Sequence, residues 1–430
     1  MAGEARYQEA YRAQLRWDMV DLDSQLPQEH RARVVWAFVS GLDLAELYAR
    51  IQAREGEPGR PPPDPKIFLA LWLFATLEGV GSARQLDRLC DRDVAYRWLC
   101  GGVPMNYHGL SDFRSAHGDV LDRLLTDSLV ALLAEGLVKP EEIAIDGTKI
   151  RASAGRGSFR KAARLAELEG LARRRVEQLK AELQDDPAAG EKRRQAARQR
   201  GAEDVARRAE EARRALEKLR AEKAERAKRH KKAEAKAGEA RASLTDPEAR
   251  LMRFPDGATR PGYNVQLAVA PGSCIIVAVE TTDRRNDAGL AGIMLEQIKR
   301  RLGVEPRRVL ADTTYATRQD VVDLAAQQID VYTPVPLDKP TVSPESARKR
   351  ASRRQHEPDA IKAWRARMAD AASKAIYQRR SRCETVNGTL KNRGLGIMRV
   401  RSVAKVNCVA LLHALAHNLW RAHCLRASPA

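Results

Sequence analysis

The chain has 430 residues, enough to bury a full core and to divide into two or three domains, and its formal net charge is +19. The apolar runs are too short or too interrupted to span a bilayer, and the N-terminus lacks a signal-peptide pattern, so we expect a cytoplasmic protein outside the membrane. Six cysteines occur without a Cys-x-x-Cys pair, which argues against a disulfide framework and against a structural zinc site.

Positive charge is concentrated in residues 160–242 and 345–405, whereas residues 1–150 carry an acidic surplus. Such concentrations are typical of proteins that neutralise phosphates, and binding of that kind weakens as the salt concentration rises. A solvated helix face is the alternative explanation, above all for residues 160–242. The charge therefore suggests a polyanionic partner but says nothing about the fold.

Residues 1–138 are predicted to form a small all-helical domain. Amphipathic runs between Gly- and Pro-rich breaks predict helices at Arg31–Arg54, Lys66–Glu78, Ser82–Leu99 and Asp119–Glu135. With Ser82 as N-cap, the third run could be a helix-turn-helix DNA reader, although the acidic balance is unfavourable for this. A helical bundle that makes dimer contacts is an equally good interpretation.

Two short apolar runs in residues 139–430 are each followed by an aspartate. The first run ends at Asp146 and Gly147, and the second, Arg308–Ala311, ends at Asp312. Both patterns predict a strand with an acid at its C-terminal end, the edge where mixed and parallel sheets handle ligands. Asp-Gly pairs are also common hairpin turns, so Asp146 alone is a weak signal.

Residues 158–242 are predicted to be an antiparallel helical hairpin inserted into the second domain. The segment is rich in Ala, Arg, Glu and Lys, and its apolar residues step by four and three in two arms of unequal length. The seam consists of Ala172, Val176, Leu179, Leu183, Val205, Ala209, Ala212, Leu216 and Leu219, with a break at residues 185–190. Whether the second arm bends near Gly201 or frays towards its lysine-rich end stays open. We expect the insertion to contact the DNA backbone or another subunit.

The remaining sequence alternates strands and helices, which predicts a mixed sheet with helices on its faces. Expected elements are a strand hairpin at 262–270 and 274–281, helices at 288–302 and 318–328, a strand at 329–334 and a helix at 359–375. Residues 341–358 are Ser-, Arg- and Lys-rich and predict a mobile loop. In the closing helix, Val403–Leu425, we interpret His413 and His417 as packing residues, because their neighbours are leucine and alanine.

Polar groups share one face of the segment that follows the 359–375 helix. At about 100° per residue, a single helix brings four of them within roughly 60°: Tyr377, Arg380, Glu384 and Lys391. Residues at such offsets ordinarily form an apolar stripe, so a polar stripe requires a partner. A solvated face with a Glu–Lys pair is the alternative.

The stripe and the two strand-end acids together suggest a metal site. Asp146, Asp312 and Glu384 supply three carboxylates, and hard divalent cations such as Mg²⁺ prefer oxygen ligands. Three carboxylates can hold two ions, which in turn can promote an in-line displacement at phosphorus. Arg380 and Lys391 would then neutralise a bound phosphate.

The spacing Tyr-x2-Arg-x3-Glu-x6-Lys, preceded by Asp146-Gly-Thr and by Ala311-Asp312-x-x-Tyr315, resembles the signature of DDE transposases of bacterial insertion sequences. Within these, the chain is similar to the superfamily named for elements four and five, and to its eleven-eighty-two group. Further matching pieces, which carry the resemblance over nearly the whole chain, are residues 65–114, 245–252, 262–266, 286–287 and 415–420.

This resemblance implies an α/β, RNase H-like mixed sheet with helices on both faces. The sheet is interrupted by the charged hairpin insertion and preceded by the all-helical domain. It also implies that Asp146, Asp312 and Glu384 are the catalytic ligands of two Mg²⁺ or Mn²⁺ ions. The side chains then expected to contact DNA are Tyr377, Arg380, Lys391, Tyr315 and Lys149.

The expected function is that of a transposase. It would bind the double-stranded inverted-repeat ends of its element, hydrolyse the end phosphodiesters, and join the freed 3′-OH to target DNA. A nucleoid-associated homodimer is expected, since two ends must be brought together. A domesticated, non-catalytic DNA-binding regulator and an RNase H-like nuclease without strand transfer are the alternatives.

Overall fold

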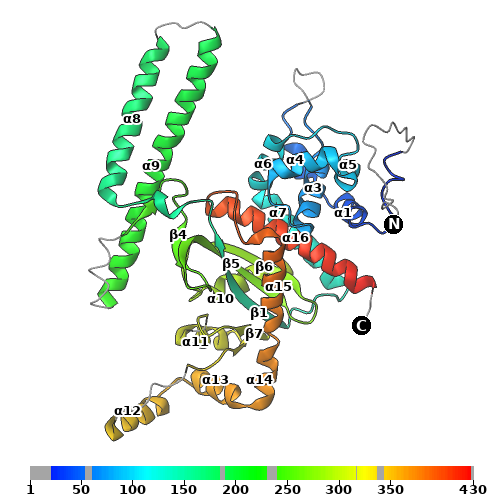
Figure 1. Cartoon of the computed structure of the whole chain (residues 1–430). Coiled ribbons are helices and arrows are strands. Elements are labelled where there is room, and N and C mark those ends of the chain that lie inside the picture. The colour runs from blue at the N-terminus through cyan, green and yellow to red at the C-terminus, as the bar shows by residue number, and fades with distance from the viewer. Residues whose placement is uncertain are drawn as a thin grey trace, which may run out of the picture.

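The computed structural model describes residues 21–53, 61–184, 189–229, 240–315, 317–336 and 343–427. Helices of the N-terminal part pack beside a mixed sheet, and a long helical hairpin projects from the sheet (Figure 1). Across these described ranges, no helix is both long enough and apolar enough to cross a membrane.

The N-terminal part surrounds one apolar helix, α3. Every residue of α3 except Lys66 is buried, and Asp64 caps its start through a hydrogen bond from the Lys66 backbone N–H, 2.8 Å long. The helices of this part are α1 (Arg31–Ser40), α2 (Ala45–Ala49), α3 (Pro65–Leu77), α4 (Ala83–Arg92), α5 (Val94–Cys100), α6 (Tyr107–Ala116) and α7 (Gly118–Ala134).

Two of the predicted helices are divided because local capping interrupts them. Within the run predicted as one helix at 31–54, α1 ends before Gly41. Helix α2 begins at Ala45, whose N–H donates to the Asp43 carboxylate. The run at 82–99 divides at Asp93, whose carboxylate accepts from two backbone N–H groups at the start of α5. A single residue, Asp93, separates α4 from α5, whereas a helix-turn-helix has a turn of three to four residues.

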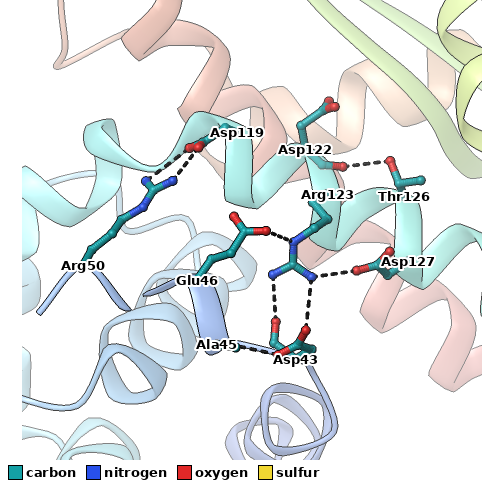
Figure 2. Close-up of polar contacts among 9 residues, drawn as sticks. All are labelled: Asp43, Ala45, Glu46, Arg50, Asp119, Asp122, Arg123, Thr126 and Asp127. Carbon is teal, nitrogen blue, oxygen red and sulfur yellow. Dashed lines mark hydrogen bonds and ion pairs between the residues drawn. The ribbon is translucent and has the colours of Figure 1, made fainter. Parts of the chain in front are cut away.

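Charged contacts fasten α2 to α7 (Figure 2). Arg123 of α7 pairs with Glu46 at 2.8 Å and with Asp127 at 3.0 Å, and it donates to the Asp43 backbone oxygen at 3.1 Å. The preceding residue of α7, Asp122, pairs with the buried Arg301 beyond the N-terminal part. The helix α7 therefore ties the N-terminal part to the rest of the protein.

The sheet has the strand order β6-β5-β1-β7-β8, with β4 beside the first residues of β5. Strand β1 is central: it pairs antiparallel with β5 and parallel with β7. This mixed arrangement is consistent with an RNase H-like domain. The strands are β1 (Glu142–Arg151), β4 (Arg250–Arg253), β5 (Thr259–Ala270), β6 (Ile275–Thr282), β7 (Arg308–Ala311) and β8 (Asp330–Tyr332).

Helices of the second part lie around this sheet (Figure 1). The segment 341–358, predicted as a loop, contains α12 instead, and 341–342 lie outside the described residues. The helices are α10 (Ala291–Leu302), α11 (Arg318–Ala326), α12 (Pro344–Gln355), α13 (Asp359–Ala369), α14 (Ala371–Gln378), α15 (Ser381–Leu390) and α16 (Val403–Ala427), with a π-helical turn, η3 (Lys391–Leu395), after α15.

Helix α16 packs between the N-terminal helices and β6, and their buried residues form one cluster. The Asn418 side chain donates to the Ile276 oxygen at 2.7 Å and accepts from the Ile276 N–H at 2.8 Å. His413 and His417 are buried, and burial lowers their pKa values to about 3 and about 4. Their prediction as packing residues is confirmed.

The insertion is the predicted antiparallel hairpin. It stands on a two-stranded neck, β2 (Phe159–Arg160) and β3 (Ala242–Ser243), and its arms are α8 (Ala162–Gln184) and α9 (Ala189–Arg229). Helix α9 begins at Ala189 and continues through Gly201 without a break. Of the predicted break at 185–190, residues 189–190 are therefore helical, and residues 185–188 lie outside the described residues. The buried seam residues are Ala172, Leu179, Ala209, Ala212, Leu216 and Leu219, whereas Val176 is half-buried, Val205 is exposed and the Leu183 side chain is outside the description.

Candidate active site

Asp146 lies in the middle of β1, opposite Leu267 of β5, and not at the end of a strand as predicted. The Asp-Gly pair is not a turn, because antiparallel pairing with β5 continues from Asp146 to Arg151. The parallel pairing of β1 with β7 ends one residue earlier, at Ile145 and Ala311. Asp146 and Asp312 therefore both follow the last pair of this parallel ladder, on neighbouring strands.

The polar stripe is not carried by one straight helix. Tyr377 belongs to α14, Arg380 lies in the short turn before α15, and Glu384 is in the first turn of α15. The backbone of Arg380 keeps right-handed helical angles (φ −54°, ψ −30°), so the side chains still follow one another on the same side. Lys391 is exposed and begins η3.

The guanidinium of Arg380 joins two of the three predicted carboxylates. Its Nη1 lies 3.5 Å from Asp146 Oδ1, and its Nη2 donates to Glu384 Oε1. Asn387, one turn further along α15, donates to Asp146 Oδ2 at 2.8 Å. The structure thus brings Asp146 and Glu384 together around one arginine, with an amide fixing the second oxygen of Asp146.

Burial dominates the electrostatics of Asp146. It raises the pKa of this carboxyl to about 6, an effect that the charge of Arg380 and the hydrogen bond from Asn387 oppose. Burial also raises the pKa of Tyr377, and the charges of Asp312 and Glu384 add to that rise. The Tyr377 phenol is therefore within electrostatic reach of both acids, and Arg380 lies 5.8 Å from its ring centre.

The three predicted carboxylates are chemically suited to bind a divalent cation, but their present arrangement does not form a binding site for one. Carboxylate oxygens are the donors that Mg²⁺ and Mn²⁺ prefer. Among the residues that the structure describes, however, no three His, Cys, Asp or Glu side chains lie close enough together to hold an ion. An ion shared by Asp146 and Glu384 would have to replace Arg380 between them.

A second polar cluster lies on the other face of β1, behind Gly147. The Asp287 carboxylate accepts from Asn264 at 2.7 Å and from Gln266 at 2.8 Å, and the Tyr315 hydroxyl donates to Gln266. A Cβ on Gly147 would lie 2.5 Å from the Asp287 carboxylate, so only glycine admits this contact. The cluster joins β1 to the turn after β7, in which the Tyr315 N–H donates to the Asp312 backbone oxygen.

Sequence reasoning assigned no role to Asp287, Gln266 or Asn387. A signal for Gln266 was present, since Asn264 and Gln266 are polar residues spaced by two in an otherwise apolar strand and so share one face. Asp287 follows β6 in a loop, and Asn387 lies among the residues of α15. Asp287 belongs to the matching piece 286–287 of the resemblance, which assigned it no role, and Asn387 does not stand out without the folded arrangement.

Two of the predicted DNA-contacting residues face elsewhere. Tyr315 is only 1% exposed, and its hydroxyl is used by Gln266. Lys149 lies an odd number of residues from Asp146, hence on the opposite face of β1, and its Nζ donates to the Arg253 backbone oxygen at 2.9 Å. Neither side chain is presented beside Asp146.

Two models of known protein families match the chain. The model described as "Transposase DDE domain" matches residues 243–419, a range that contains Asp312 and Glu384 but begins after Asp146. The model described as "Transposase domain (DUF772)" matches residues 20–116, the N-terminal helices. Searches of the curated proteins and of the solved structures found no match. Both matched domains are transposase domains, and together they indicate a DDE transposase of an insertion sequence.

Proposed function

We propose that Asp146, Asp312 and Glu384 are the catalytic carboxylates of this transposase and that they bind Mg²⁺ or Mn²⁺, two ions in the active complex. The observation that carries the proposal is the contact of one guanidinium, that of Arg380, with both Asp146 and Glu384. The parallel register that puts Asp312 beside Asp146 supports it. A pair of such cations supplies activation of the attacking oxygen and neutralisation at the leaving oxygen.

The protein's own residues position these groups. Asn387 and Arg380 hold the Asp146 carboxylate from α15, so that α15 and β1 keep one relative position. Glu384 is half exposed and faces the side from which DNA approaches. Arg380, together with Lys391, neutralises the phosphate that is attacked, and Tyr377 contacts the same strand.

The proposed reaction sequence is the one that the resemblance to DDE transposases implies. The transposase binds the double-stranded inverted-repeat ends of its element, hydrolyses the phosphodiester at each end, and directs the freed 3′-OH to a phosphodiester of target DNA. Both steps use the same carboxylates. A homodimer serves two ends, and the group named for element eleven-eighty-two is the proposed affiliation.

The test is removal of one carboxylate. Asp312→Ala and Glu384→Ala proteins should keep their affinity for an end-containing duplex and lose both nicking and joined donor–target products in Mg²⁺ or Mn²⁺. Glu296→Ala, which removes an exposed carboxylate of α10, is the matched control and should behave as the unmodified protein. Nicking at the unmodified rate in either site variant would reject the assignment.

The same assay separates the rival functions. Nicking by the unmodified protein without joined products would identify a nuclease that lacks strand transfer. Tight binding to the ends without nicking would identify a non-catalytic regulator.

A further inference from the structure

A groove of about 860 Å³ separates the inserted hairpin from the body of the protein. One wall is the face of α9 between Asp204 and Lys218. The other wall is formed by four segments of the body: residues 245–250, the end of β6 with residues 283–284, Leu290 and Ile293 at the start of α10, and residues 401–405 at the start of α16. The groove therefore exists only because the insertion lies alongside the sheet.

Exposed cations face this groove from both walls. Lys218 comes from α9, and Arg284, Arg401 and Lys405 come from the body. Within the described part of the chain, none of these four side chains makes an ion pair or a hydrogen bond. Arg207 and Arg214 also line the groove, and their ion pairs with neighbours on their own exposed helix contribute little stability, so both can turn to a ligand.

The acids that line the groove are mostly engaged within the protein. Asp204 pairs with Arg208 at 2.8 Å, and Asp283 pairs with the buried Arg250 at 2.8 Å. Three further lining acids accept hydrogen bonds from neighbouring groups: Asp246, Glu248 and Glu280. Glu211 is exposed beside Arg207, whose pKa its charge helps to raise. A ligand in the groove thus meets free positive charge on both sides.

We propose that this groove holds the sugar–phosphate backbone of DNA, as a contact separate from the carboxylate site. Charge complementarity selects a polyanion, and the placement of cations on two facing walls suits a chain of phosphates that passes between them. The choice of DNA over another polyanion rests on the proposed function. The hairpin that forms one wall is inserted after β1, the strand that carries Asp146.

The experiment measures DNA affinity of the full-length protein for a duplex oligonucleotide at several salt concentrations. The groove variant is Lys218→Gln with Arg401→Gln, one cation from each wall. The control is Arg174→Gln with Lys180→Gln, which removes the same charge from exposed positions of α8 that do not line the groove. All four residues are exposed, so thermal melting should be unchanged in both variants.

In the groove variant, the slope of log affinity against log salt should become shallower by up to about 1.8, because each lost phosphate contact removes about 0.9. Affinity near 0.1 M salt should fall about tenfold or more, while the control variant should keep most of its DNA affinity and most of its salt dependence. Equal losses in the two variants, or none, would overturn the inference. Loss of a DNA-free dimer in sedimentation with unchanged DNA affinity would also overturn it, and would assign the groove to a second copy.

This outcome is independent of the catalytic proposal. Nicking by the unmodified protein and by the control variant reports on the carboxylate site. A protein that never nicks, but whose groove variant shows the shallower salt dependence, would refute the catalytic proposal and leave the groove assignment in place.

Discussion

Asn387 donates a 2.8 Å hydrogen bond to Asp146, although 241 residues separate the two along the chain. The bond connects the centre of the sheet to the helix that carries Glu384, and it reaches the carboxylate oxygen that Arg380 leaves open. The relative position of two predicted catalytic acids therefore depends on a residue that is itself neutral.

Replacing Asn387 by alanine should raise the pKa of Asp146 above its value of about 6, because the hydrogen bond from Asn387 lowers that pKa. The acid limb of the nicking pH profile should then move to higher pH. Thr385→Ala, on the exposed side of the same helix, is the control and should leave the limb unmoved. An unchanged profile in Asn387→Ala would show that Asp146 ionisation does not limit the reaction.

Replacing Asp146 by asparagine should stabilise the fold above pH 6. The folded pKa of Asp146 lies above its ordinary value of 3.8, so the folded state binds the extra proton, and this stability is lost as the pH rises through about 6. At pH 8 the free energy of unfolding of the Asp146→Asn protein should exceed that of the parent by up to about 3 kcal/mol, since one pKa unit corresponds to about 1.4 kcal/mol. The gain, measured as the difference in melting between variant and parent, should vanish near pH 4.

Gly147→Ala tests the cluster behind the site. The added methyl would meet the Asp287 carboxylate and the Gln266 amide, each at 2.5 Å, and would force them from β1. We expect a loss of about 1–3 kcal/mol in unfolding free energy, as for other overpacked sites. Gly155→Ala is the matched control, because nothing lies near its Cβ position. Equal melting temperatures of the two variants would show that the cluster accommodates the added methyl group without loss of stability.

Deleting residues 161–238 tests the insertion as a unit. The apolar contacts of the hairpin form a cluster of their own, apart from the main core, and the neck strands hold the flanking residues together through the pairing of Phe159 with Ser243. With a short linker in its place, the remaining protein should therefore fold. It should bind DNA more weakly, with a shallower dependence on salt. Unchanged end binding, assembly and transposition would show that the insertion has none of the proposed roles.

Period and composition predicted the strands and the hairpin well, because those elements are determined by local patterns. The seam residues of α8 and α9 are an example, since most of them are buried at the spacing of the pattern. Capping limits this reasoning. At Asp93, a side chain that accepts two backbone N–H groups overrides an amphipathic pattern that continues through it. In α12 every residue except Pro344, Ala347 and Ala351 is charged or polar, so no apolar period exists to indicate a helix.

The site required contacts between distant segments. Asp146 was expected at a strand end because its apolar run stops there, but pairing with β5 extends β1 by five residues, to Arg151. The stripe from Tyr377 to Lys391 was recognised from its spacing, whereas the turn at Arg380 and its contact with Asp146 depend on how α15 packs on β1. The position of Asp287 behind Gly147 likewise depends on contacts between segments that are distant in the sequence.

The hydrogen bonds of Asn418 to β6 have a counterpart at the opposite side of the sheet, where Arg367 of α13 donates to the Val331 oxygen of β8 at 3.3 Å. Helices thus contact the outer borders of β6 and β8, so a second molecule could add a strand at either border only by displacing α16 or α13 there. These two borders are accordingly guarded against edge-to-edge pairing, even when many copies gather on one nucleic acid.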